Sequence, residues 1–92
     1  MKTKTEKQKL PKWFKGAHYS EGGEITNKFS GASYYLNASE LSMYDFIMGS
    51  QYMIEMRGGL FNPSTINLQK EMSKGLSWFR KNNGKAYMVL LD

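Results

Sequence analysis

The sequence predicts a small α+β domain in which an antiparallel β-meander packs against two α-helices. Short aromatic and β-branched runs separated by turn residues occupy its first part, two long segments with helix-capping signals follow, and a short apolar segment ends the chain. Ninety-two residues are enough for one domain and too few for two. We therefore divide the chain into a basic flexible tail, residues 1–12, and a single domain, residues 13–92.

The expected meander follows the tail and has three strands. Residues 13–19 form the first, residues 24–27 the second, and residues 32–36 the third, which is rich in aromatics that favour strands. The two connections contain Gly22-Gly23 and Ser30-Gly31, because glycine adopts positive φ at little cost.

The first helix is expected over residues 38–57. Asn37 is typical of a helix N-cap, and Glu40 stands three residues later, as in a capping box. Gly58 and Gly59 are expected to end the helix with C-cap geometry.

The second helix is expected to start at Asn62-Pro63, with asparagine as the cap and proline in the first turn, and to end at Arg80 or Lys81. Gly75 falls on its apolar stripe, which indicates a close approach of two helices. The closing residues 85–91 are short enough to be either helix or strand, and their apolar side chains are expected to be buried.

The positive charge is concentrated at the N-terminus. Residues 1–15 hold one acid and six lysines, whereas the other 77 residues hold seven bases and seven acids. The six are Lys2, Lys4, Lys7, Lys9, Lys12 and Lys15. Such a tail either solubilises the protein or attracts phosphates and acidic surfaces.

The second helix has an apolar stripe opposite a basic face. The stripe consists of Leu68, Met72, Leu76 and Phe79, and the basic face of Lys70, Ser73, Lys74, Ser77 and Lys81. Trp78 stands at the edge of the basic face. A tryptophan among lysines can stack on a nucleic-acid base while the cations bind phosphates. The alternative is a solvated lysine face with Trp78 packed against the sheet.

The first helix carries apolar residues on more than one side, which is typical of a buried helix. Either the sheet and the second helix cover all of these sides, or one side meets another chain. In the second case the interface would be formed by Met43, Ile47 and Ile54, and homo-oligomers through this helix are one outcome.

Chemically reactive groupings are scarce. There is no cysteine, the single histidine is His18, and no glycine-rich phosphate loop is present. Asp45 stands on the otherwise apolar first helix, where pairing with Arg57 or Arg80 would be a structural role. We therefore expect a non-enzymatic protein without catalytic residues, metal or cofactor. No apolar run is long enough to span a membrane, so a cytoplasmic protein with no membrane partner is expected.

Several segments of the chain resemble a known family. They are residues 40–49, Gly58-Gly59 with residues 61–63, Gly75-Leu76 with residues 78–80 and 82–83, and residues 86–91. Together these segments resemble a family of small uncharacterised proteins encoded by marine bacteriophages and some bacteria. The resemblance implies a phage product that acts in a bacterial cytoplasm or is built into a virion, and it implies no particular activity.

Three functions remain open at this point. The first is a binding protein whose tail, with the basic helix face, contacts nucleic acid or an acidic host protein. The second is a structural or assembly subunit that uses the apolar first helix. The third is a small enzyme, which would rest on Asp45 alone.

Overall fold

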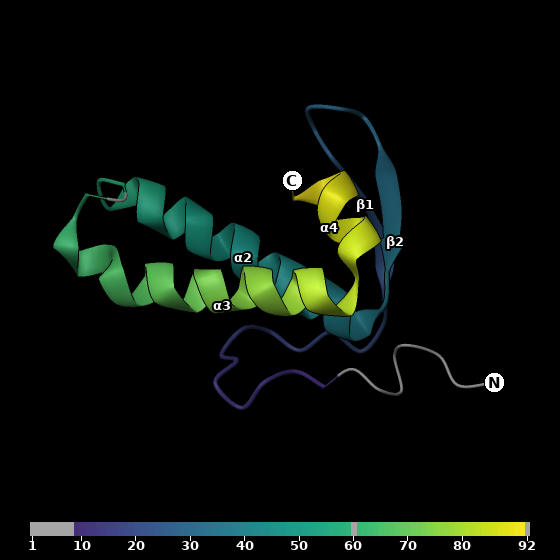
Figure 1. Ribbon diagram of the computed structural model, residues 1–92, viewed down its shortest axis with the longest axis horizontal. Coiled ribbons are helices and arrows are strands. Elements are labelled where there is room, and N and C mark those ends of the chain that lie inside the picture. The colour runs from purple at the N-terminus through teal and green to yellow at the C-terminus, as the bar shows by residue number, and fades with distance from the viewer. Residues whose placement is uncertain (1–8, 60, 92) are drawn as a thin grey trace.

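The computed structural model describes residues 9–59 and 61–91, and in these residues it confirms the α+β class (Figure 1). In chain order the elements are β1 (Gly23–Thr26), β2 (Ser33–Leu36), α2 (Ala38–Met56), the 3-10 turn η1 (Pro63–Thr65), α3 (Ile66–Asn82) and α4 (Gly84–Leu90). Helices α2 and α3 lie side by side, and the β-hairpin with α4 stands at one end of this pair (Figure 1).

Within residues 9–59 and 61–91 the sheet has two strands, so the expectation of a three-stranded meander was wrong. Strands β1 and β2 pair antiparallel, with Gly23 opposite Leu36 and Thr26 opposite Ser33. Residues 13–19 form no strand. They cross the helix pair instead, because bulky aromatics in this segment bury themselves against α2.

The glycines of the two expected turns are required for different physical reasons. Gly31 in the hairpin loop has a φ of 79°, as a turn glycine should. Gly22 has no positive φ, but an added Cβ would collide with the carbonyl oxygen of Leu36. A close backbone approach therefore explains this glycine better than turn geometry does.

Helix α2 begins and ends as the sequence predicts. The side chain of Asn37 accepts a hydrogen bond from the backbone of Glu40, and the Glu40 carboxylate accepts one from the backbone of Asn37. Gly58 and Gly59 end the helix with φ values of 100° and 84°. These left-handed conformations are accessible to glycine without strain.

Gly75 allows α2 and α3 to pack closely, as expected. An added Cβ at this position would lie 3.1 Å from Cγ1 of Ile47 and 3.2 Å from Sδ of Met43. The core continues from this contact to Phe79 and Leu36, which are both fully buried.

The closing segment is a helix, α4, which settles the alternative left open by the sequence. Its N-cap Asn83 accepts a hydrogen bond from Ala86 and donates one from Nδ2 to Oε2 of Glu40, at 2.9 Å. Since Glu40 also caps α2, one buried carboxylate joins the starts of two helices. Helix α4 packs on α3 and β2 through Ala86 and Leu90.

Candidate functional site

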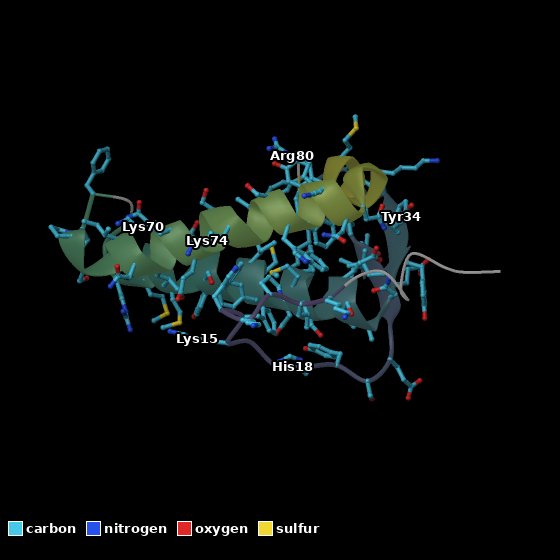
Figure 2. All side chains as sticks on the ribbon, turned by 60° about the horizontal axis from the view of Figure 1, so that its bottom comes forward. Lys15, His18, Tyr34, Lys70, Lys74 and Arg80 are labelled. Carbon is cyan, nitrogen blue, oxygen red and sulfur yellow. The ribbon has the colours of Figure 1, made fainter. Side chains whose placement is uncertain are left out.

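Residues 9–19, here called the N-terminal segment, cross one flank of the α2–α3 pair (Figures 1 and 2). Phe14 is buried there, and its ring meets that of Phe46 edge-on at a centroid distance of 5.4 Å. The Trp13 ring also packs on Phe46, at 5.9 Å. Further along, the amide of Tyr19 donates to Oγ of Ser42 at 2.9 Å. The aromatic pair therefore anchors the segment on α2.

The segment also contacts α3 at three points. In order along α3 these are an ion pair between Glu71 and Lys15 (3.5 Å), a cation–π contact of Lys74 with Trp13 (5.9 Å to the ring centroid), and a hydrogen bond from Nε1 of Trp78 to the carbonyl of Lys9 (3.1 Å). Positions 71, 74 and 78 share one side of a helix. Because the partner numbers fall as the α3 numbers rise, the segment runs antiparallel to α3.

An open cavity of about 520 Å³, here called the basic groove, lies where Lys15 of this segment meets the ends of α2 and α3. Its charged lining consists of Lys15, Arg57, Lys70, Lys74 and Glu71. Four cations and one carboxylate thus face a single concavity. Cations that three different elements bring together make a site suited to an anionic ligand.

Glu71 is the acidic residue that lines the basic groove, and its carboxylate pairs with Lys15. Its partner Lys15 is 76% exposed, so their ion pair is worth at most about 1 kcal/mol. Lys70 and Lys74 are one helical turn apart and repel each other, which favours an added anion between them. A ligand phosphate can therefore replace Glu71 as the partner of Lys15 at little cost.

The structure brings together residues that the sequence placed in two separate regions. Lys9, Lys12 and Lys15 are exposed on the N-terminal segment, and Lys15 lines one groove with Lys70 and Lys74 of α3. Lys81 is exposed in the last turn of α3. Lys2, Lys4 and Lys7 lie outside the described residues.

Trp78 contacts the N-terminal segment, a neighbour that the sequence did not indicate. Its indole is half-buried and donates from Nε1 to the carbonyl of Lys9. This contact gives Trp78 an anchoring role. Stacking of its ring on a nucleic-acid base stays a prediction.

The three residues expected at a protein interface are core residues of this chain. Met43, Ile47 and Ile54 are 0%, 2% and 3% exposed, because they face α3. Met43 is fully enclosed in this conformation, whereas Ile47 and Ile54 also line a cavity between α2 and α3. The apolar side chains of α2 that do reach solvent are Met48, Tyr52, Met53 and Met56.

Arg57 and Glu71 are groove residues that sequence reasoning missed. Arg57 was noted only as a partner for Asp45, and Asp45 is exposed. The missed signal was the Trp13-Phe14 pair two residues after Pro11, which is compatible with a docked segment as well as with a strand. In residues 9–59 and 61–91, no group of three or more histidine or carboxylate side chains is placed to hold a metal ion.

No helix in the described part of the chain is long and apolar enough to cross a bilayer. The chain matches no protein-family model, no curated protein and no solved structure.

Proposed function

We propose that this chain is a non-enzymatic binding protein that contacts nucleic acid through the flank covered by the N-terminal segment. The observation that supports the proposal best is the basic groove, where Lys15, Arg57, Lys70 and Lys74 surround one carboxylate. The lysines of residues 1–8, which lie outside the described residues, would add further contacts with phosphates. Following the family resemblance, we further propose that it acts as a phage accessory factor in a bacterial cytoplasm.

The expected binding mode is electrostatic and only weakly selective for sequence. Contacts of lysine and arginine with phosphates release counterions, so affinity falls as salt rises. For four phosphate contacts with a single strand, the logarithm of the affinity should fall with the logarithm of salt at a slope of about −3. The tail lysines would make the slope steeper.

The direct test is fluorescence anisotropy with a labelled single-stranded oligonucleotide at several salt concentrations. Replacing Arg57 and Lys70 by alanine should weaken binding and reduce the slope by about 1.4. Glu71→Gln is the matched control in the same groove, and it should strengthen binding because it removes the competing carboxylate.

Two results would count against the proposal. Binding that is unchanged in the Arg57 and Lys70 double variant would mean that the basic groove is not used. Equal affinity for polyglutamate at matched charge would favour an acidic protein as the partner, since a carboxylate polymer lacks phosphates and bases.

The alternative of a structural or assembly subunit is favoured by a different observation. Met48, Tyr52 and Met56 are exposed at four-residue intervals, so they form a ridge along α2. Contiguous apolar surface of this kind is typical of a protein contact. This role does not compete with the basic groove for residues.

A further inference from the structure

The second flank of the α2–α3 pair holds two adjoining cavities, of about 300 and 310 Å³. Gln51 and Leu91 line both of them, so the two form one continuous depression, here called the corner groove. Its apolar walls are formed by Tyr44, Met48, Ile54, Met72, Leu76 and Leu90. One cavity is lined by the hairpin loop and the end of α4, and the other extends between α2 and α3 as far as Gly59.

The corner groove and the basic groove face opposite ways. Gln51 and Glu55 of α2 line the corner groove, whereas Met53 and Arg57 line the basic groove. A shift of two residues turns a helix by about 200°. An occupant of the corner groove would therefore leave the basic groove free.

A fully exposed aromatic stands at the rim of the corner groove. Phe29 is 101% exposed and lines the cavity through the hairpin loop. Asn27 holds this loop: its Oδ1 accepts from the amides of Phe29 (2.8 Å) and Ser30 (3.3 Å), and its Nδ2 donates to the carbonyl of Val89 (2.9 Å). A loop fixed in this way loses little entropy when its aromatic side chain is bound.

We propose that the occupant of the corner groove is a second copy of this chain, with Phe29 of each copy inserted into the groove of the other. A two-fold dimer requires the projecting group and the receiving cavity to lie on the same face of the molecule. Phe29 and the corner groove meet this requirement, because Phe29 itself lines the cavity. A buried phenylalanine removes about 150–250 Å² from water.

The charges around the groove complement each other in this arrangement. Lys28 adjoins Phe29 on the loop that would enter the partner, and Glu55 lines the receiving groove. The exchange brings each copy's lysine towards the other's glutamate. Two such pairs would form, related by the two-fold axis.

The proposed interface would combine the corner groove and Phe29 with the exposed ridge of Met48, Tyr52 and Met56. A standard interface removes about 800 Å² per partner, which is about an eighth of the 6506 Å² accessible on this chain. Burial raises the pKa of the Tyr44 phenol above its ordinary value.

The test is light scattering coupled to size exclusion on the full chain, over a range of concentrations. A dimer of twice 10.6 kDa is expected. Phe29→Ser should raise the dissociation constant about tenfold or more, as is usual for a central aromatic. Phe61→Ser is the matched control, because Phe61 is equally exposed, at 98%, but does not line the corner groove.

Three further variants make the test independent of any folding effect at residue 29. Met48→Glu places a charge in the groove wall and should also yield monomers. Lys28→Glu should weaken the dimer, and adding Glu55→Lys should restore it, since the two charges then exchange places in both copies. A monomeric mass at millimolar concentration, or equal effects of Phe29→Ser and Phe61→Ser, would overturn the proposal.

Discussion

The two flanks of the α2–α3 pair differ in what covers them. One flank is covered by residues 9–19 of the same chain, and the lysines of this segment make it basic. The other flank is an apolar groove that the described residues leave open. The difference shows how one short helix pair can provide two distinct surfaces, because a segment without regular structure buries apolar area while it carries its charges to the outside.

The largest loss of stability should come from removing Phe14, which anchors the N-terminal segment on α2. Phe14→Ala removes a buried ring from contact with Phe46 and should lower the free energy of unfolding by about 3 kcal/mol. Chemical denaturation measures this change. Met48→Ala on the open flank is the control and should cost about 0.5 kcal/mol or less in the monomer. Similar losses for both variants would contradict the distinction between the flanks.

A somewhat smaller loss of stability is expected from changes in the α2–α3 contact, which both flanks share. Gly75→Val should cost about 2 kcal/mol, because even its Cβ would press on Ile47 and Met43. Gly49→Ala is the matched change in α2, where an added Cβ meets nothing within 4 Å. It should stabilise the protein by up to about 1 kcal/mol in thermal unfolding. A Gly75 variant as stable as the parent chain would show that the helices are not in close contact there.

The smallest of these effects concerns the attachment of the N-terminal segment to α3. Trp78→Phe keeps an aromatic ring but removes the donor to the carbonyl of Lys9, which should cost about 1 kcal/mol. The expected result is faster tryptic cleavage after Lys9 and Lys12, with little change at Lys70. An unchanged cleavage rate would mean that this hydrogen bond does not hold the segment.

The ends of α2 were predictable because their signals are local. Asn37 with Glu40, and Gly58 with Gly59, specify the ends of α2 through contacts within a few residues. The path of residues 13–19 was not predictable in this way. Trp13 and Phe14 suit a strand as well as a docked segment, and only the tertiary contact with Phe46 decides between them.

The same reasoning explains what was missed in the candidate site. The lysines of the tail and of α3 could be read from the sequence, but their meeting in one groove depends on the path of the N-terminal segment. For α2, helical periodicity identified several apolar sides without showing which of them faces α3. Met43 and Ile47 are buried because their side of α2 packs against α3, while Met48 and Tyr52 lie on another side and are exposed.

The measurement that tests the central claim most directly is a nuclear magnetic resonance titration of the full chain with a single-stranded oligonucleotide. The proposal predicts shifts at Lys15, Arg57, Lys74 and the indole N–H of Trp78, with none at Met48 or Leu91. The shifts should be lost at high salt. Shifts confined to the corner groove, or no shifts at low salt, would contradict the assignment of nucleic-acid binding to the basic flank.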